Sequence, residues 1–576
     1  MIFLFDLIAF LVVLIVPGYL VADRYFQGLE KAVLSVFLSL SITSFFYYIL
    51  VSFYQISIEL IYFYALILLV IFFVVKKPKF ETVLISIKKI KFGSLPIQRE
   101  NLLNLFILFI LILIFSLMAF SIPLNKIIAY DDASYHLPII LNIADDGQKT
   151  FFSETHNIYQ VRSNQFPLLF ESFTGATKFL LKNDFFWLIS FFSLILSLFL
   201  IYFISKETGQ NQIFSSILYA FSPLVILFSR YFYVDTFLSM FFLGAVFFVL
   251  KYVKDNNLLF VLVAGFLSGL MFLTKFTGGI FFAGLFLFLL YKKKFKALVF
   301  FALIFVLVSL VFVVSHLGVP VEQASVGSYG SFSSNPFFQI PLNIFRVAEV
   351  FFIFFSNNFF IFFIPLLFVL GLFWEKKKTD FSVLFFISLI LFLGIIFVNQ
   401  AYPTTSGFPR YFLPVYSLLC IFSGIQFKKI VLLKDKRISV FASSLFVLFM
   451  LFTSVSILSE FSVVPSANVL PSEANKIENS FDTKVWFING AALVINLDKA
   501  TCFDYSWKTD FSGEPCDFLK KHKINYIVHF HIDKLPDLGD FGIQLKESLD
   551  KNECSEVISV SRGSLNSATY RIIHSK

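Results

Sequence analysis

Long apolar segments dominate this sequence, and each is about as long as a helix that crosses a lipid bilayer. A spanning helix takes ~20 consecutive, mostly apolar residues. Of the 576 residues, 58% are hydrophobic and 14% are charged, whereas soluble chains are roughly 25% charged. We therefore predict a mainly α polytopic membrane bundle, with spans at residues 2–22, 31–53, 57–75, 101–123, 184–204, 211–229, 235–253, 257–273, 276–291, 297–316, 350–374, 380–400, 410–427 and 438–460.

The distribution of lysine and arginine predicts how these spans are oriented. Basic clusters lie at residues 76–99, 292–296, 376–378 and 428–437, whereas residues 317–344 contain neither lysine nor arginine. Cytoplasmic loops carry the excess of these residues, so we expect the clusters inside the cell and both termini outside. The net charge of +9 then reflects membrane orientation, and no nucleic-acid partner is expected. The first segment lacks the basic flank and cleavage site of a signal peptide and is predicted to remain a helix.

Two regions differ from the spans in composition. Residues 124–183 are predicted to form a long outer loop, in which the apolar stretch 166–181 is interrupted by charges and is expected to lie as a helix in the membrane interface. Residues 461–576 are polar, with short alternating runs typical of strands, and predict a small α/β domain outside the membrane. In an oxidising compartment two of its cysteines, Cys502, Cys516 and Cys554, can pair and one is left over.

The stretch AYDDASYHLP, residues 129–138, places Asp131 and Asp132 next to the expected span 101–123, with Tyr135 and His136 close behind. An acidic pair in a solvated loop is common. The aromatic residue, the histidine and the apolar surroundings instead favour a functional site at the membrane surface.

Other ionisable residues fall at the same predicted ends of spans: Arg230, Asp235, Lys275 and Arg410. A charge near the middle of a membrane helix costs ~2.5–3.5 kcal/mol, and less at the interface. Each has a structural explanation as well: a basic residue at a helix end often anchors the helix by reaching the interface, and Asp235 is of the type that caps a helix N-terminus. Their convergence on one surface favours a shared role.

Transfer of a sugar from a polyprenyl phosphate to a hydroxyl needs these groups. A carboxylate must accept the proton of the attacking hydroxyl. The departing phosphate is already an anion, so it needs lysine or arginine to hold it rather than a general acid. The apolar lipid tail requires a site beside a membrane groove. Carboxylates and cations at the outer ends of spans satisfy these requirements.

Five stretches in order resemble motifs of the GT-C superfamily of membrane glycosyltransferases, which includes the dolichyl-phosphate-mannose protein mannosyltransferases and the lipid A aminoarabinose transferases. They are DDASYHLPIILNIADDG, NQFPLLFESFTGATKFLLKND, LYAFSPLVILFSRYFYVD, LTKFTGG and RYFLPVYSLL, within residues 101–430. The chain departs from the family in the three spans within residues 1–100, which precede the span 101–123 that leads to the first motif. It also has Phe166, Pro167 and Leu168 where the family usually has Pro-Pro-Leu, and Asp132 where Glu is commoner.

The resemblance implies a role for each candidate residue. Asp131 is the expected general base, and Asp132 is its companion, which binds either a divalent metal ion or the acceptor; no other cofactor is implied. The remaining roles are donor-phosphate binding by Arg410, Lys275 and Arg230, and substrate binding by Tyr135, His136, Asp235 and Tyr411.

The spans, the motifs and the change in composition together predict three regions: extra membrane helices with a basic linker in 1–100, a catalytic membrane domain in 101–460, and an extracytoplasmic α/β domain in 461–576. The expected partners are a polyprenyl-phosphate sugar, an acceptor lipid, glycan or protein, and the bilayer of the cytoplasmic membrane, with the active site extracytoplasmic.

Two other functions share some of these features. A lipid or glycan transporter or flippase also has many spans, but more often shows internal repeats and charges at mid-membrane in broken helices. No repeat is evident in this sequence. A ligase or polymerase of lipid-linked glycans would share the donor chemistry but follows other sequence patterns.

Overall fold

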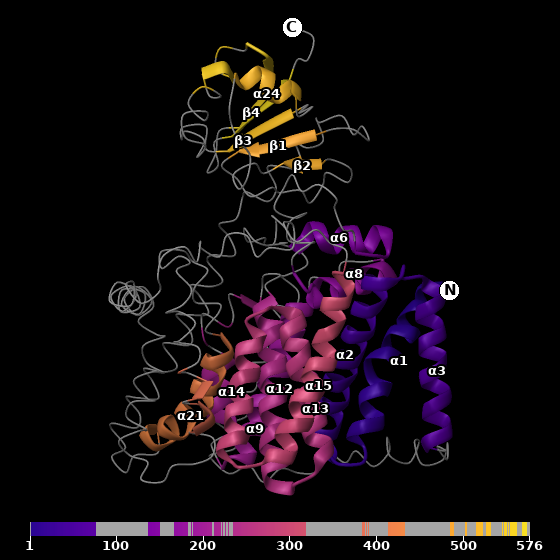
Figure 1. Ribbon diagram of the computed structural model, residues 1–576, viewed down its shortest axis with the longest axis vertical. Coiled ribbons are helices and arrows are strands. Elements are labelled where there is room, and N and C mark those ends of the chain that lie inside the picture. Colours follow the sequence, from indigo (N-terminus) through magenta and orange to yellow (C-terminus); the bar gives the residue numbers. More distant parts are fainter. Residues whose placement is uncertain are drawn as a thin grey trace.

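The computed structural model describes residues 2–76, 136–149, 166–182, most of 186–229, 234–317, single positions in 383–390, residues 413–431, and five strands with short flanking segments between 484 and 572. These residues form a helical bundle with a small sheet beyond one end of it (Figure 1). The principal bundle helices are α1 (Ile2–Ala22), α2 (Gly28–Phe53), α3 (Ile58–Lys76), α9 (Ile189–Glu207), α12 (Val234–Asp255), α13 (Leu258–Thr274), α14 (Gly278–Tyr291), α15 (Phe295–Ser315) and α21 (Leu413–Val431).

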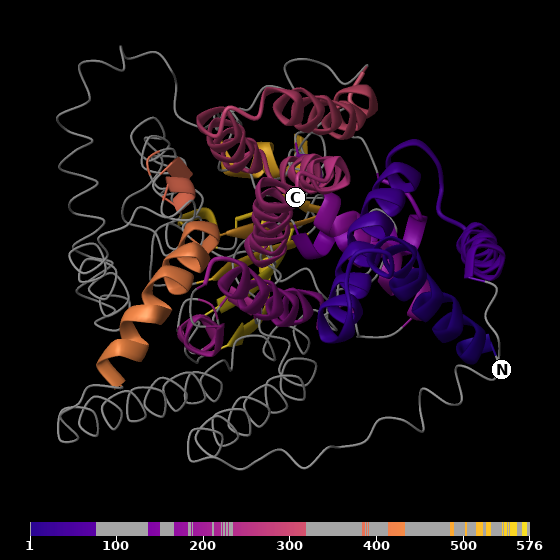
Figure 2. The ribbon, with the colours of Figure 1, turned by 90° about the horizontal axis from the view of Figure 1, so that it is seen from below.

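Six helices in the described part of the chain are long and apolar enough to cross a membrane: α1, α2, α3, α9, α12 and α15. Helix α12 is central and contacts α9, α13, α14 and α21 (Figure 2). In its most apolar 18-residue stretch, 89% of the residues are buried. By contrast, only 17% of the residues in the corresponding 18-residue stretch of α3 are buried. The apolar surface that α3 exposes is what a lipid-facing helix needs.

The predicted spans correspond to helices wherever the structure describes most of their residues, with one difference. Helix α10 (Gln212–Ala220) covers only the first half of the span expected at 211–229. Pro223 follows shortly, and a proline disfavours helical backbone at the preceding residue, Ser222. The predicted spans 101–123, 350–374 and 438–460, and much of 380–400, lie outside the described residues.

A proline inside α1 shows how closely the first two helices are fitted. Pro17 has no N–H, so the carbonyl of Val13 lacks its usual partner within the helix. The hydroxyl of Thr43 on α2 donates to that carbonyl at 3.0 Å. Gly18 lies so close to α2 that a Cβ there would be 2.0 Å from the backbone oxygen of Ser35. The α1–α2 contact therefore requires glycine at this position.

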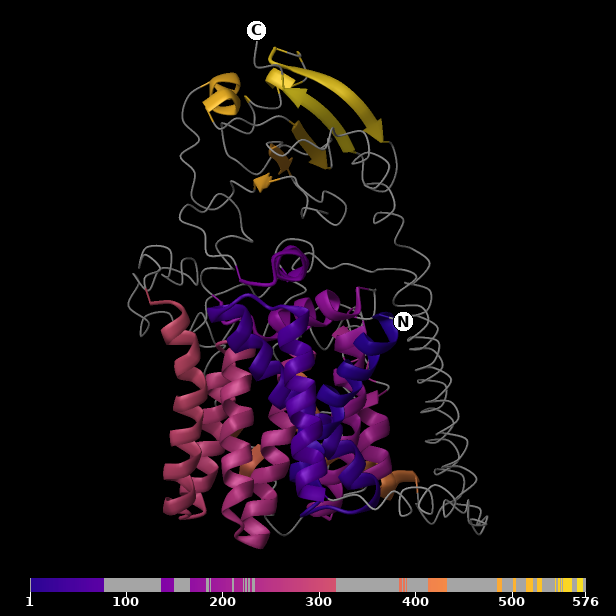
Figure 3. The same cartoon turned by 90° about the vertical axis from the view of Figure 1, so that its right-hand side faces the viewer.

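Two further helices do not span and lie at one end of the bundle, here called the α6 end: α6 (Leu137–Asp146) and α8 (Leu169–Leu181) (Figures 1 and 3). Helix α8 falls within the stretch 166–181 where a helix in the membrane interface is expected, but residues 169–177 are all buried. The reason is that α8 packs between α6 and α2. A Cβ on Gly175 would be 2.7 Å from the side chain of Ile143, so α6 and α8 touch through a glycine.

The opposite end of the bundle carries basic residues and an ionic cluster. The turn between α14 and α15 contains Lys292–Lys294. Nearby, Lys251 and Lys254 of α12 bind the carboxylate of Glu207 at 2.6 and 2.9 Å, and Lys251 lies 3.7 Å from Glu30 of α2. These contacts join α2, α9 and α12 at the end away from α6.

The C-terminal residues form a five-stranded sheet on the same side of the bundle as α6 (Figures 1 and 3). The strand order is β2-β1-β3-β5-β4, parallel from β2 to β3 and antiparallel beyond it. The strands are β1 (Lys484–Ile488), β2 (Thr501–Phe503), β3 (Tyr526–Phe530), β4 (Ser555–Ser561) and β5 (Ser567–Ile572).

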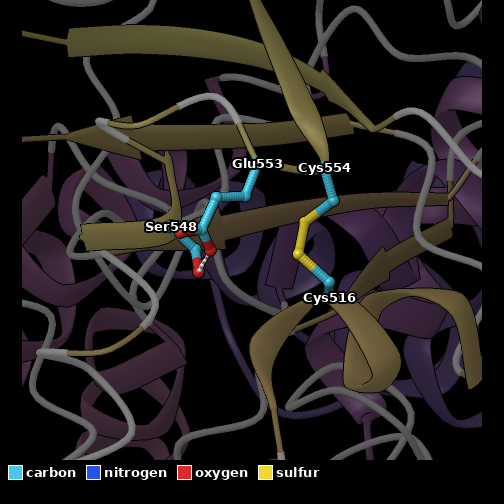
Figure 4. The surroundings of a disulfide bond; sticks show 4 residues. All are labelled: Cys516, Ser548, Glu553 and Cys554. Carbon is cyan, nitrogen blue, oxygen red and sulfur yellow. Dashed lines mark hydrogen bonds between the residues drawn. A yellow bond between two sulfur atoms is a disulfide. The ribbon is translucent and has the colours of Figure 1, made fainter. Parts of the chain in front are cut away.

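A disulfide identifies which of the C-terminal cysteines pair. Cys516 of helix α24 (Pro515–Lys521) is bonded to Cys554, which immediately precedes β4 (Figure 4). Beside it, the hydroxyl of Ser548 donates to the carboxylate of Glu553 at 2.7 Å. The bridge closes a separation of 38 residues and ties α24 to the edge of the sheet.

Candidate active site

The structure describes three of the residues predicted for the site, namely His136, Asp235 and Lys275, and all three lie at the α6 end. The others lie outside the described residues: Asp131, Asp132, Tyr135, Arg230, Arg410 and Tyr411.

Asp235 and Lys275 form a buried ion pair. Asp235 is in the first turn of α12, and Lys275 is the residue that ends α13. Since α12 and α13 are antiparallel and adjacent in the chain, the start of one meets the end of the other. Lys275 Nζ lies 2.9 Å from Asp235 Oδ1, and the side chains are 11% and 1% exposed. Lys275 is thus directed at a carboxylate inside the bundle rather than outward as an interface anchor.

His136 also has a carboxylate partner. Its Nδ1 is 2.5 Å from Oε1 of Glu171 on α8, and both side chains are buried. A carboxylate accepts, so Nδ1 carries the proton and donates it. Sequence reasoning treated Glu171 only as an interruption of an apolar stretch. The cost of burying an unpaired carboxylate was the signal that it would find a cationic or donating partner.

Aromatic rings connect the two pairs. The ring of Phe170 on α8 lies 6.4 Å from that of His136 and 5.5 Å from that of Phe237 on α12. Phe237 follows Asp235 by two residues and also packs on Phe173, at 6.0 Å. Both pairs therefore belong to one apolar layer, where low polarity strengthens each charge interaction.

A third polar contact, between Lys149 and His316, was not predicted from the sequence. Lys149 Nζ is 3.0 Å from His316 Nε2 and 3.3 Å from the carbonyl oxygen of Phe166. His316 Nδ1 is 2.7 Å from the carbonyl of Phe312, which can only accept. The proton is therefore on Nδ1, and Nε2 accepts a hydrogen bond from the amine of Lys149.

Burial shifts the ionisation of both groups. It lowers the pKa of Lys149 to about 7, against a smaller opposing effect of Glu171. It also lowers the pKa of His316 to about 3, and the nearby Lys149 charge adds to that shift. Near neutral pH the His316 imidazole is therefore uncharged, and the Lys149 amine is present in both its protonated and its neutral form.

The far end of α6 is tied to the last turn of α2 and to the loop between α2 and α3. The backbone N–H of Lys149 donates to Val51 at 2.9 Å, and that of Ile56 donates to Gly147 at 2.6 Å. Gly147 has a φ of 71°, and a Cβ there would be 2.7 Å from the oxygen of Ile56. Glycine is required at this position, and the N-terminal helices help to hold the loop helix.

No group of three or more histidine, cysteine, aspartate or glutamate side chains in the described ranges is arranged to hold a metal ion. Asp132, the predicted ligand, is outside those ranges, so the described residues define no metal centre.

Comparison with known proteins agrees with the motif resemblance. Residues 176–318 match the model of the family described as "Dolichyl-phosphate-mannose-protein mannosyltransferase". No curated protein matches the chain significantly.

Several solved structures share the fold. ArnT from Cupriavidus metallidurans bound to undecaprenyl phosphate is 12% identical with a TM-score of 0.54, over 82% of this chain and 98% of that one. The apo form of the same enzyme is 11% identical with a TM-score of 0.53, over 83% of this chain and 99% of that one. The apo oligosaccharyltransferase of Archaeoglobus fulgidus is 12% identical with a TM-score of 0.50, over 81% of this chain and 74% of that one.

The fold is thus that of a polytopic membrane protein and is similar to that of ArnT. Within that class, it is similar to the GT-C mannosyltransferases through residues 176–318, as the sequence motifs indicated.

Proposed function

We propose that this protein transfers a sugar from a polyprenyl-phosphate donor to an acceptor hydroxyl at the extracytoplasmic surface of the cytoplasmic membrane. The observation that supports this most strongly is the collection of buried acid–base pairs at the α6 end, in a bundle with the fold of an enzyme solved with undecaprenyl phosphate. Charged groups at the edge of a membrane domain suit a substrate with a phosphate and an apolar tail.

Asp131 is the general base of this proposal. It removes the proton of the acceptor hydroxyl as the oxygen attacks the sugar, and the polyprenyl phosphate leaves as an anion. Asp131 and Asp132 precede His136 by five and four residues, and a chain spans at most ~3.6 Å per residue. The acidic pair is therefore held by the covalent chain within ~20 Å of the α6 end.

Basic residues would hold the donor phosphate. Arg410 is the main candidate because a guanidinium can bind two phosphate oxygens at once. Lys275 supplies further positive charge at the α6 end, beside the carboxylate of Asp235. Arg230, Tyr135 and Tyr411 complete the proposed substrate contacts, on the resemblance to the family.

The C-terminal α/β domain is proposed to share the extracytoplasmic side. Its sheet lies on the side of the bundle where α6 lies, and the Cys516–Cys554 disulfide is typical of oxidising compartments (Figures 3 and 4).

Asp132 is proposed to bind either a divalent metal ion or the acceptor. Chelation separates these roles: loss of turnover in EDTA, restored by Mg²⁺ or Mn²⁺, supports the metal, and unchanged turnover supports the acceptor.

The proposal is tested by incubating the purified protein with a panel of polyprenyl-phosphate sugars and measuring release of polyprenyl phosphate. We expect Asp131→Asn to lower turnover by ~100- to 10,000-fold, the usual contribution of a general base, while donor binding is kept. Asp255→Asn, which alters an exposed carboxylate at the end of α12 away from α6, is the matched control. Turnover by Asp131→Asn at the wild-type rate would exclude the mechanism, and no release from any donor would exclude the function.

A further inference from the structure

Glu171 is a buried carboxylate without an assigned role. Only 2% of the surface of Glu171 is exposed, and its neighbours on α8 are apolar or small. One oxygen accepts from His136, and the other, Oε2, has no hydrogen-bond partner among the described residues. An apolar residue would fill this place at less cost, because a buried carboxylate loses its hydration. The contact with His136 is what the carboxylate supplies.

His136 stands where the outer loop becomes α6. It occupies the N-cap position of that helix, yet its side chain makes no capping hydrogen bond. Instead, its ring is turned to α8, where it meets Glu171 and the edge of Phe170. The residue that begins α6 is therefore fixed to a buried helix rather than to its own.

The opposite end of α6 is held independently. Backbone bonds join Gly147 and Lys149 to Ile56 and Val51, and the Lys149 amine reaches His316 of α15. The C-terminal end of α6 is thus fixed by several contacts, and the Glu171–His136 bond holds its N-terminal end to α8.

We propose that Glu171 is a positioning residue: by holding His136, it fixes the start of α6 and thereby places the Asp131–Asp132 segment for sugar transfer. The catalytic part of this inference rests on the proposed function; the anchoring of α6 does not. The charge matters because a bond to an ionised acceptor is shorter and about twice as strong as a neutral one.

The test compares Glu171→Gln with Ser172→Ala. The glutamine keeps the shape of Glu171 but not its charge. Ser172 is the neighbouring buried residue on α8, and its hydroxyl has no hydrogen-bond partner in the described part of the chain, so its loss controls for general disturbance of the helix. Hydrogen exchange of the α6 amides is measured together with turnover and donor affinity.

We expect Glu171→Gln to speed exchange in α6 and to lower kcat by about 100-fold, the scale for a misplaced reacting group, with donor affinity changed less than about 2-fold. Ser172→Ala should match the wild type in all three. The double variant His136→Gln, Glu171→Gln should lose no more than the stronger single variant, because both remove one contact.

Unchanged exchange in α6 would overturn the anchoring, and faster exchange with normal kcat would overturn the positioning role. Equal loss of donor affinity and turnover would also overturn it, since that result indicates general damage to the site. If the wild type transfers no sugar from any donor, the proposed function fails, and the exchange rates still decide whether Glu171 anchors α6.

Discussion

Lys149 shows how one side chain can make the stability of this protein depend on pH. Its amine is enclosed by the His316 ring and the Phe166 carbonyl, and burial lowers its pKa from 10.5 to about 7. Above pH 10.5 the amine is neutral in both the folded and the unfolded chain. Between those values only the unfolded chain keeps the proton, so the folded state loses stability as the pH falls toward 7.

We therefore expect the wild type to gain stability relative to Lys149→Met between pH 7 and pH 10. The gain should be about 1.4 kcal/mol per pH unit. Thermal unfolding of both proteins in detergent, at half-unit steps, measures the difference. A difference that stays constant across this range would show that Lys149 is solvated and charged in the folded protein.

Arg410 is expected to act on the donor rather than the acceptor. A hydrogen bond to a charged group contributes about 1.5–3 kcal/mol, so Arg410→Ala should weaken donor affinity by about 10- to 100-fold. Arg410→Lys should recover part of this, because an ammonium keeps the charge and loses the paired geometry. Binding of a labelled polyprenyl phosphate gives the affinities. Normal donor binding by Arg410→Ala would make this residue a helix-end anchor.

At the scale of elements, the Asp235–Lys275 pair joins the start of α12 to the end of α13. Removing one partner of a buried ion pair takes away the charge that balances the other, and such changes typically cost about 3–5 kcal/mol. Lys275→Met should therefore lower the unfolding temperature strongly, and adding Asp235→Leu should restore much of it. Thermal unfolding of the two single variants and the double variant measures this. Equal stability of Lys275→Met and the wild type would show that the pair is not closed in solution.

Elements set by a local apolar run were predictable from the sequence, and features set by packing between helices were not. Spans such as Val234–Asp255 and Phe295–Ser315 were predictable because a long apolar run has few alternatives. The break after Ala220 was missed, although Pro223 signalled it. Burial of α8 was missed because it depends on Gly175 meeting Ile143 of α6, a contact between helices that hydropathy does not contain.

The described part of the site was predictable as a location more than as a set of contacts. His136, Asp235 and Lys275 were found because ionisable residues at span ends are unusual. Their partners depend on helix packing: Glu171 is 35 positions from His136, and Lys149 is 167 from His316. Local periodicity carries no information at such separations.

At the scale of the whole molecule, the basic residues predict that the α6 end and the sheet face away from the cytoplasm. In intact cells, cysteines placed at Ser134 and Leu535 should react with an impermeant maleimide. A cysteine at Lys293, in the turn at the opposite end of the bundle, should be protected until the membrane is opened. Labelling of Lys293→Cys with protection of the other two would reverse the topology and move the proposed site to the cytoplasmic side.

Helix α2 and the loop that follows it hold the end of α6. The family resemblance made the first three helices an addition before the catalytic region, yet Val51 and Ile56 carry two of the backbone bonds that hold the end of α6. A truncation that begins after residue 76 would remove these partners. The α2 end of the N-terminal region is therefore part of the structure that holds α6 in place.

The bridge between Cys516 and Cys554 has a consequence for the order in which the protein matures. Both cysteines lie beyond the last apolar segment, so the ribosome has made every membrane helix before the second thiol emerges. If the tail is exported, the membrane bundle assembles first, and the bond that fastens α24 to the sheet is made afterwards by the oxidising machinery outside. Cells that lack a thiol oxidant should then accumulate inserted protein whose tail alone is sensitive to proteases.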